Sequence, residues 1–414
     1  AMTTILDINC RNITADRPPV LLAAGPVLLR PLGMAGIPAI VASSEDDPAF
    51  ASRYCGGRCI LPPRNEPDAL IEALLDTGDR LFRALGRRVP LMYGEDYFLE
   101  LIYMHRARFE KKFLLLLSDP EVALGLLTKD RFEALARGRY LPVPRSLPWD
   151  LLSEIEDPVL AKPRSKFSWY HSPLQVQLFS EHSKAIIFEN GRAAAADPRV
   201  RRFRDHLTFQ EYVRGGDRQL WSFHGVADEH GKILACFVGR KLRTSPPLTG
   251  ESSFIELIHD DALATFGRRM AEQVPLKGAF KMDFKTDVES GEHFLLEVNA
   301  RFNLWHYLGA ANGLNLMEVA YDYLVAGKRP PPLSYRTDTR WLCLPLDWRA
   351  YRQLAARRQL SLIGWLFSIL FTRTVYNVFA WSDPTPLAMD FVRKFRKLLG
   401  LMKVWSRQWL SMAS

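Results

Sequence analysis

Short hydrophobic runs separated by polar and amphipathic segments recur along the first third of the chain. The run from Pro19 to Gly25 is apolar and closed by glycine, which is typical of a buried parallel strand and its turn. A helix is predicted from Val27 to Met34, and a second strand from Ile37 to Ser43. Repetition of this unit predicts a parallel sheet flanked by helices. The segment contains no G-x-G-x-x-G motif, so a nicotinamide or flavin site is not indicated.

The pattern then changes from helical to extended. An amphipathic helix is predicted from Glu66 to Gly86, a strand from Pro90 to Tyr93, and a long helix from Tyr97 to Leu117. Prolines 142, 144 and 148 mark a connection between two units. Beyond it, strand-like runs predict a largely antiparallel region at residues 159–163, 185–188, 208–213, 220–227 and 233–238.

The segment from Gly278 to Arg301 predicts a hairpin that turns at residues 289–291. Because side chains alternate along a strand, one face is apolar, with Phe280, Met282 and Phe284 on the first strand and Phe294, Leu296 and Val298 on the second. The other face is charged. Its members are Lys281, Asp283, Lys285, Glu297, Asn299 and Arg301. Carboxylate and amide oxygens suit Mg²⁺, and the cations suit phosphate oxygens; the alternative is a solvated strand with cross-strand salt pairs.

The final segment has a different character. The run from Leu360 to Phe371 is apolar but too short to span a bilayer, and predicts a buried or interfacial helix. The tail that follows mixes Arg393, Lys394, Arg396, Lys397, Lys403 and Arg407 with aromatic and aliphatic residues. Such a helix either docks on its own protein or lies on an anionic membrane.

Composition narrows the class of protein. The chain has 414 residues, 48% of them hydrophobic, which is enough for two or three domains. Five scattered cysteines favour reduced thiols, because Cys55 and Cys59 have no second pair to complete a zinc site. The first residues lack the features of a signal peptide, so a cytoplasmic protein is expected. A net charge of +9 suggests anionic partners, but no nucleic-acid motif accompanies it, and nucleic acid is not expected.

One order of residues combines these observations. Lys129, then Lys162-Pro163, then Gln210-Glu211-Tyr212-Val213, then Asp283, then Glu297-Val298-Asn299-Ala300-Arg301 resembles the ATP-grasp superfamily. Within it, the chain is similar to carboxylate–amine ligases of the D-aspartate ligase and carbamoyl phosphate synthetase large-subunit type. The resemblance covers roughly residues 15–330. Its most specific part is the Glu-x-Asn-x-Arg element with an upstream aspartate.

The resemblance implies an α/β (α+β) architecture in three parts. A small Rossmann-like domain occupies residues 15–124, and the ATP-grasp domain occupies residues 125–330 with its lid at about 160–213. A basic helical extension follows at 331–414. The family's glycine-rich lid loop is replaced here by Arg164-Ser-Lys166-Phe-Ser-Trp169-Tyr170, which contains no glycine. This departure concerns the mobility of the lid loop.

The resemblance also implies roles for individual residues, with ATP and Mg²⁺ as cofactors. The expected ATP-binding residues are Lys129, Lys162, Gln210, Glu211, Tyr212, Val213 and, for the ribose, Asp217. The expected metal ligands are Asp283, Glu297 and Asn299. The expected catalytic residues are Lys281, Arg301 and Lys241, the last within a basic loop, residues 240–250, beside the substrate carboxylate.

Three functions remain open on this fold. The first is a ligase that joins an acidic small molecule to an amine or thiol through an acyl phosphate, and homodimers are common in the resembled family. The second is an ATP-dependent carboxylase or kinase. The third is a catalytically weak binding protein held at the inner membrane by the tail. The scattered histidines His105, His182, His224 and His306 show no catalytic spacing, although His306 lies close after Arg301.

Overall fold

The computed structural model describes residues 6–8, 14–164, 177–179 and 183–395, and within them the chain forms two compact units. The first unit contains the residues up to 115, residues 324–327 and the residues from 377 onward. The second contains residues 116–323 and 328–376. Residues 165–176, which include all of the predicted lid loop except Arg164, and the tail residues 396–414 lie outside the described part. The predicted domain boundaries therefore stay a prediction.

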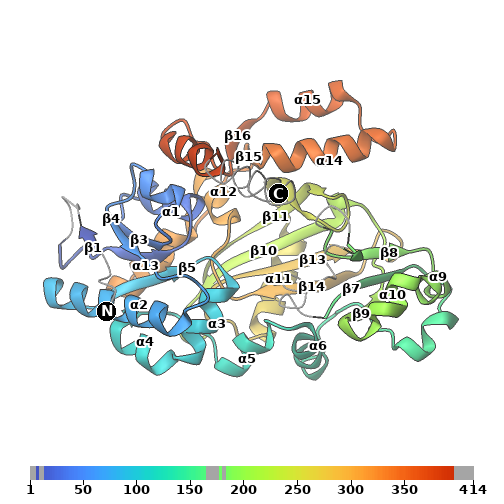
Figure 1. Cartoon of the computed structure of the whole chain (residues 1–414), viewed down its shortest axis with the longest axis horizontal. Helices are drawn as coiled ribbons and strands as arrows, with labels where there is room; N and C mark the ends of the chain where they lie inside the picture. Colours follow the sequence, from blue (N-terminus) through green and yellow to red (C-terminus); the bar gives the residue numbers. More distant parts are fainter. Residues whose placement is uncertain (1–5, 9–13, 165–176, 180–182, 396–414) are drawn as a thin grey trace, which may run out of the picture. The chain divides into compact units, whose positions relative to one another are not determined.

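The first unit is built on a six-stranded sheet in the order β1-β4-β3-β2-β5-β6. All neighbouring strands are parallel except β1 and β4, as the repeated strand–helix pattern predicts. Figure 1 shows these strands in blue, with α1 on one side of them and α2 and α4 on the other. The strands are β1 (Leu6–Ile8), β2 (Val20–Ala23), β3 (Ala39–Ser43), β4 (Gly57–Ile60), β5 (Val89–Tyr93) and β6 (Phe113–Leu114).

Helices of the first unit follow the predicted pattern with one exception. They are α1 (Pro26–Met34), the short 3-10 helix η1 (Pro48–Ala51), α2 (Pro67–Leu85), α3 (Asp96–Met104) and α4 (Arg106–Lys112). Helix α2 begins at Pro67. A proline is suited to this position because the N–H groups of the first turn have no partner within the helix, and proline has none. Gly86, in the left-handed conformation, caps the other end. The single long helix predicted from Tyr97 to Leu117 is wrong. It breaks at His105, and Phe113 enters the sheet as β6.

The second unit contains a large and a small sheet. The large sheet has seven strands in the order β14-β13-β10-β11-β12-β15-β16, antiparallel except for the parallel pair of β15 and β16. Its strands are β10 (Leu220–Ala227), β11 (Ile233–Ser245), β12 (Glu251–Ile258), β13 (Gly278–Thr286), β14 (His293–Asn299), β15 (Thr339–Leu342) and β16 (Arg373–Tyr376). The predicted hairpin is thus confirmed as β13 and β14, at one edge of this sheet.

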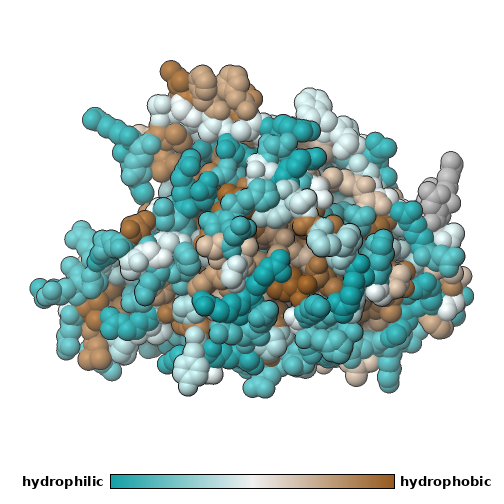
Figure 2. Space-filling model, turned by 180° about the vertical axis from the view of Figure 1, so that it is seen from behind, coloured by the Kyte–Doolittle hydropathy of each residue, from teal (hydrophilic) through white to brown (hydrophobic). Residues whose placement is uncertain are grey.

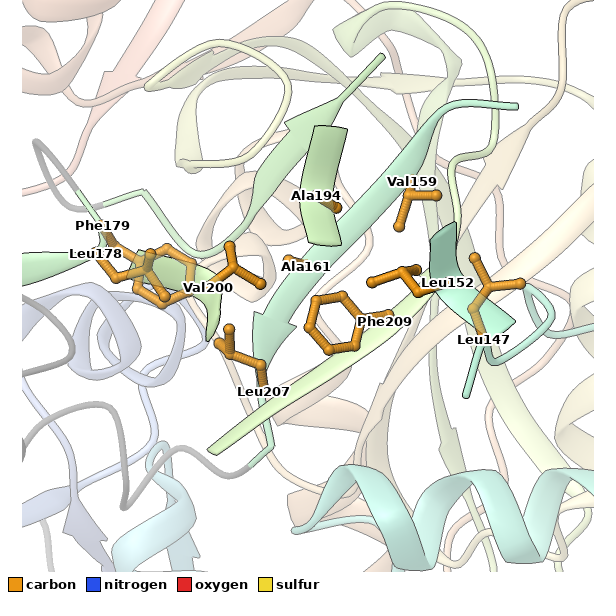
Figure 3. Packing of buried hydrophobic residues seen from close by; sticks show 10 residues of the cluster. All are labelled: Leu147, Leu152, Val159, Ala161, Leu178, Phe179, Ala194, Val200, Leu207 and Phe209. Atoms are coloured by element: carbon orange, nitrogen blue, oxygen red, sulfur yellow. The ribbon is translucent and has the colours of Figure 1, made fainter. Parts of the chain in front are cut away.

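The small sheet has the order β8-β7-β9, with β7 (Val159–Pro163) between β8 (Ile186–Phe188) and β9 (Leu207–Glu211). One of its faces is covered by η2 (Trp149–Glu154), α9 (Gly191–Ala196) and α10 (Pro198–Phe203). Figure 3 shows the hydrophobic core between them, in which Val159 and Ala161 of β7 meet Phe209 of β9. Because side chains alternate, Lys162 points away from this core, toward the opposite face of the sheet.

The remaining helices lie wholly or largely in the second unit. They are α5 (Pro120–Gly125), α6 (Lys129–Gly138), η4 (Arg204–His206), η5 (Asp217–Gln219), α11 (Asp261–Gln273), α12 (Trp305–Ala311), α13 (Leu316–Ala326), α14 (Leu344–Ala356) and α15 (Leu362–Leu370). Residues 385–395, in the first unit, are also helical. No helix of the described residues is both long and apolar enough to cross a membrane.

The two faces of the large sheet differ in polarity. On one face, Phe223 of β10 and Phe280 of β13 pack with Gly267 of α11, where a Cβ atom would lie 2.5 Å from the Phe223 ring. On the other face, α12 approaches β11 so closely that a Cβ atom on Gly239 would lie 2.4 Å from the ring of Trp305. This second face also carries the polar residues predicted on the hairpin.

Candidate active site

The two predicted metal carboxylates lie directly opposite each other on the hairpin. Asp283 of β13 pairs with Glu297 of β14, and Lys281 pairs with Asn299, so all four project from the same face of the sheet. The hydroxyl of Ser222, on the neighbouring strand β10, donates to Asp283 Oδ1. Lys281 Nζ lies 2.8 Å from Asp283 Oδ2. Asp283 is therefore held from two sides, and its partner carboxylate faces it across the strand pair.

Charge in this group is balanced within the protein. Burial lowers the pKa of Lys281, an effect that Asp283 opposes and the nearby Lys241 reinforces. Burial raises the pKa of Asp283, but the ammonium groups of Lys281 and Lys241 outweigh it, so that the pKa ends below its ordinary value. Glu297 interacts with both Lys281 and Asp283. Asp283 is consequently ionised at neutral pH, as a metal ligand must be.

The donor set fits a cation that also binds a phosphorylated substrate. Within the described residues, no group of three or more His, Cys, Asp or Glu side chains converges on one point. Among the described residues, this face carries the carboxylates of Asp283 and Glu297, the amide oxygen of Asn299, which accepts from Arg301 at 3.4 Å, and the hydroxyl of Ser222. Magnesium is commonly bound by one or two carboxylates and completes its octahedron with water and substrate phosphates. These residues therefore match Mg²⁺ better than a metal that needs a closed protein cage.

Lys162 belongs to the same group, although it comes from the small sheet. Burial lowers its pKa, and the charges of Glu133 and Glu297 oppose that shift. Its ammonium therefore lies near Glu297, one of the two carboxylates predicted to bind the metal. Lys129 begins α6, one turn before Glu133. Residues four apart lie on the same face of a helix, so α6 presents Lys129 beside the residue that acts on Lys162.

The predicted adenine segment lies at the end of β9. Gln210 is buried and shares the face of the small sheet that carries Lys162, whereas Glu211 is turned toward Arg145, whose backbone N–H it accepts at 2.7 Å. Val213 is buried beyond the end of the strand. The N–H groups of Glu211 and Tyr212 donate to the carbonyls of Arg145 and Pro158, so neither these two donors nor the Glu211 carboxylate is left for a base.

Lys285 is a site residue that the sequence analysis did not assign. Its Nζ lies 3.1 Å from the hydroxyl of Tyr212 and 4.2 Å from the centre of the Tyr212 ring. Burial lowers the pKa of Lys285 to about 8, against the opposing charges of Asp217 and Asp287. Its position two residues after Asp283 on the charged face is the signal that could have identified it.

Asp217 has a structural task beside its predicted ribose contact. Its carboxylate accepts from the N–H and the hydroxyl of Thr244, at 2.7 and 2.8 Å, and from the N–H of Leu248 at 2.9 Å. These bonds fix the turn between β11 and β12 and occupy most of the acceptor capacity of the carboxylate. The ribose role of Asp217 stays a prediction.

The basic loop predicted at residues 240–250 is mostly not a loop. Its first half is the end of β11, and two of its arginines are neutralised by partners from elsewhere in the chain. Arg240 pairs with Glu256 of β12, and Arg243 forms a two-bonded pair with Asp347 of α14. Lys241 is the member of this stretch whose charge acts on Lys281 and Asp283. Its catalytic role stays a prediction. The sequence identifies the two arginines, but it does not predict which carboxylates pair with them.

Two buried histidines lie beneath Lys281 on the polar face. His224 of β10 pairs with Lys281 in the sheet and is stacked between the rings of Phe237 and Trp305, at 4.7 and 5.0 Å. Neither of its ring nitrogens has a hydrogen-bond partner within the described residues. His306 follows on α12, with its ring 5.9 Å from that of His224. Burial holds the pKa of His224 well below its ordinary value and lowers the pKa of His306 to about 4.

These histidines should make the protein less stable in acid. In the unfolded chain their pKa values return to near 6.5, so below that pH the unfolded state binds more protons than the folded one. Stability is then lost as the pH falls from 6.5 toward 4, by about 1.4 kcal/mol per pH unit for each histidine. We expect H224F, which keeps the aromatic stack and removes unsatisfied nitrogens, to match or exceed wild-type stability at pH 7.5 and to reduce this slope. Urea unfolding at several pH values, with H230Q at an exposed histidine as the control, measures both effects. An unchanged slope in H224F would contradict the assignment.

The chain was compared with known proteins. No family model matches it, and no curated protein matches its sequence. Solved structures do. The biotin carboxylase domain of Hydrogenobacter thermophilus 2-oxoglutarate carboxylase, a dimer in complex with MgADP, ADP and bicarbonate, aligns over 78% of this chain and 73% of its own, with a TM-score of 0.56 and 15% identity.

Two further solved structures are similar to the chain. N5-carboxyaminoimidazole synthetase from Staphylococcus aureus aligns over 78% of this chain and 81% of its own, with a TM-score of 0.54 and 10% identity. An L-amino acid ligase from Bacillus licheniformis aligns over 76% and 77%, with a TM-score of 0.50 and 13% identity. The shared architecture is the ATP-grasp fold, as the residue pattern predicted.

Proposed function

We propose that this chain is a Mg-ATP-dependent ligase that activates a carboxylate as an acyl phosphate and transfers it to an amine or a thiol. The observation that carries the proposal is the convergence of five charged residues on one face of the large sheet. Asp283 and Glu297 face each other there, and Lys281, Lys241 and Lys162 act electrostatically on one or both of them. An arrangement with both signs of charge suits a metal and a polyphosphate together.

Each residue of this group has a proposed role in phosphoryl transfer. Asp283, Glu297 and Asn299 would hold Mg²⁺, which supplies charge neutralisation for the phosphates when bound. Lys162 and Lys129 would bind phosphate oxygens, and the backbone from Glu211 to Val213 would hold the adenine. Lys241, Lys281 and Arg301 would orient the substrate carboxylate and stabilise the negative charge that grows as its oxygen attacks the γ-phosphorus.

Lys281 connects these tasks through its contact with Asp283. A cation that binds Asp283 competes with the Lys281 ammonium for the same carboxylate. Displaced from Asp283, Lys281 is free to meet a phosphate or a carboxylate, and an anion beside it opposes the lowering of its pKa by burial. The negative charge of the substrate would then balance Lys281, as the Asp283 carboxylate does before the cation binds.

The experiment that tests the function is ADP release from Mg-ATP in the presence of paired acids and amines. We expect release to depend on one acid together with one amine, and to disappear in E297A. Formation of the amide, followed by mass spectrometry, would identify the product. Absence of ADP release with every pair, together with no thermal shift on adding Mg-ATP, would overturn the proposal and favour a binding protein without activity.

A second candidate is ATP-dependent carboxylation, because two of the similar structures are a biotin carboxylase domain with bicarbonate and a carboxyaminoimidazole synthetase. This reaction also needs activation of a carboxylate by ATP, so the same residues would serve it. Bicarbonate belongs in the substrate panel for that reason. ADP release that requires bicarbonate and only an amine acceptor, with no other acid, would establish the second candidate over the first.

Membrane association through the basic tail remains a separate proposal. Of the tail, residues up to Phe395 are described, and Arg393 and Lys394 both pair with Asp390 on the same helix. Part of the basic charge of this segment is thus neutralised locally. The residues from 396 onward, including Lys397, Lys403 and Arg407, lie outside the described part.

A further inference from the structure

Helix α15 exposes an apolar face that nothing in the proposed reaction uses. Four of its large side chains lie on one side at helical spacing, and each is more than half exposed: Ile363 at 69%, Phe367 at 62%, Leu370 at 67% and Phe371, just after the helix, at 74%. Monomeric soluble proteins rarely leave a contiguous group of this kind in water, and such patches mark interaction surfaces. Figure 2 shows hydrophobic residues gathered at the top of the view, where α15 lies in Figure 1.

The opposite side of α15 is firmly attached to the second unit. Trp365 is buried, and its Nε1 donates to Asp347 of α14 at 2.8 Å. Ile369 packs against the cluster of Leu242, Phe254 and Leu342. Helix α14 in turn packs on β11 and β12, so α15 forms the outer layer of this region. The exposed face is therefore a fixed feature and not a frayed helix.

The hydroxyl groups on α15 and at its ends are bonded within the helix itself. The Ser361 hydroxyl accepts from the N–H of Gly364, Ser368 donates to the carbonyl of Trp365, and Thr372 donates to the carbonyl of Ser368. No charged residue occurs between Ser361 and Thr372. A protein partner would gain hydrogen bonds from free hydroxyls, whereas a hydrocarbon environment requires that none be left over. The helix thus has the polarity of a segment that enters lipid.

The helix α14 and the turn that precede this apolar face carry an excess of positive charge. Between residues 344 and 376 the single acidic residue is Asp347, which is buried against Arg243. The same stretch carries four exposed arginines without an ion pair to any described residue: Arg349, Arg352, Arg357 and Arg358. Trp348 of α14 is partly exposed and contacts the ring of Trp365, at the border between the apolar and the charged zones. Aromatic residues at such a border are typical of membrane interfaces.

We propose that α15 and the arginines of α14 form a docking surface for an anionic lipid bilayer. Ile363, Phe367, Leu370 and Phe371 insert among the acyl chains near the headgroups, and Arg349, Arg352, Arg357 and Arg358 bind the headgroup phosphates. The helix lies in the interface and does not cross the bilayer. This surface is separate from the tail and does not depend on the proposed ligase reaction.

Sedimentation of the full chain with lipid vesicles tests the proposal. We expect binding to mixed vesicles of phosphatidylcholine and phosphatidylglycerol that weakens in high salt, and weaker binding to phosphatidylcholine alone. The double variant I363Q/F367Q should bind the mixed vesicles about tenfold less or weaker still, because two buried apolar side chains are lost. The matched control F82Q/M104Q, which changes exposed apolar residues on α2 and α3, should bind as the wild type does.

Further variants separate the charge from the apolar face and from the tail. R357Q/R358Q should reduce binding to the mixed vesicles several-fold, and deletion of residues 396–414 should leave most of the binding in place. Wild-type binding by I363Q/F367Q, or loss of binding on deleting 396–414 alone, would overturn the proposal. The proposal would also be overturned if the wild type bound no vesicles but formed dimers, and I363Q/F367Q were monomeric. A second copy of the chain would then be the partner of this face. ADP release without vesicles should be unchanged in I363Q/F367Q, so a failed ligase assay leaves this test intact.

Discussion

Replacement of Glu297 by glutamine is expected to reduce ADP release by about 10²–10³-fold, the range typical of losing one preorganised electrostatic contact in a catalytic site. The substitution keeps the size of the side chain but removes one of the two carboxylates that face each other across β13 and β14. Lys162 and Lys281 then each lose one of the two anions that support their charge, and keep Glu133 and Asp283 respectively. Steady-state ADP release at saturating Mg-ATP measures the change.

The control for E297Q lies on the same hairpin. E292Q alters an exposed glutamate close to the turn and should leave turnover unchanged. Thermal unfolding should be similar for both variants, because Glu297 is partly exposed and lies at the surface of the sheet face. Full activity in E297Q would remove the basis of the proposed metal site, whereas equal losses in E297Q and E292Q would indicate damage to the hairpin.

Replacement of Asp347 by alanine is expected to destabilise the folded protein by about 3–5 kcal/mol, the cost of leaving a buried charged partner unpaired. Asp347 is fully buried and accepts four hydrogen bonds, two from Arg243 and one each from Ser253 and Trp365, all at 2.8–2.9 Å. Without it, Arg243 retains its charge in a site closed to water, and α15 loses the bond to Trp365. Urea unfolding followed by tryptophan fluorescence measures the loss.

The control for this stability prediction is Asp338, whose ion pairs with Arg336 and Arg373 are exposed. D338A should change the free energy of unfolding by about 1 kcal/mol or less, because exposed pairs contribute little. A D347A variant as stable as D338A would show that α14 is not anchored through this carboxylate. Neither variant touches the proposed metal ligands, so ADP release by the folded fraction should persist in both.

Local periodicity was sufficient to predict much of the fold. Buried parallel strands, the amphipathic α2 and the hairpin of β13 and β14 all follow from runs of apolar residues and their spacing. The faces of β13 also follow, because its alternation is unbroken from Phe280 to Lys285. Local patterns suffice where the neighbours of a residue in sequence are also its neighbours in the sheet.

The pattern failed on β14 for a specific reason. The register shifts between Asp283 and Phe284, and Leu296 is the extra residue of a β-bulge. Leu295 therefore faces the core with Phe284, while Phe294 pairs with Lys285 on the polar side. The prediction that Phe294, Leu296 and Val298 share one face is wrong, since one inserted residue reverses every position before it.

Long-range contacts explain the other differences. The partners of Arg240 and Arg243 come from β12 and α14, and the stacking of His224 depends on Trp305, far along the chain. Ser222 and His224 were visible as polar positions in the apolar strand β10, but only the register with β13 reveals that they contact or underlie Asp283 and Lys281. A sequence lists the charged residues, whereas the fold decides which charges remain for a ligand.

The strands that follow residue 330 protect the large sheet from self-association. Strand β15 covers the edge of β12, and the short β16 covers β15 with Arg373 at its start. A chain shortened to the residues that resemble the superfamily would uncover β12, whose sequence ESSFIELI is extended, half apolar and without a lysine or a proline. Bare strands of that composition pair with copies of themselves. The last two strands thus cover this edge of the sheet. A shortened protein intended for structural work should therefore keep the chain through Tyr376.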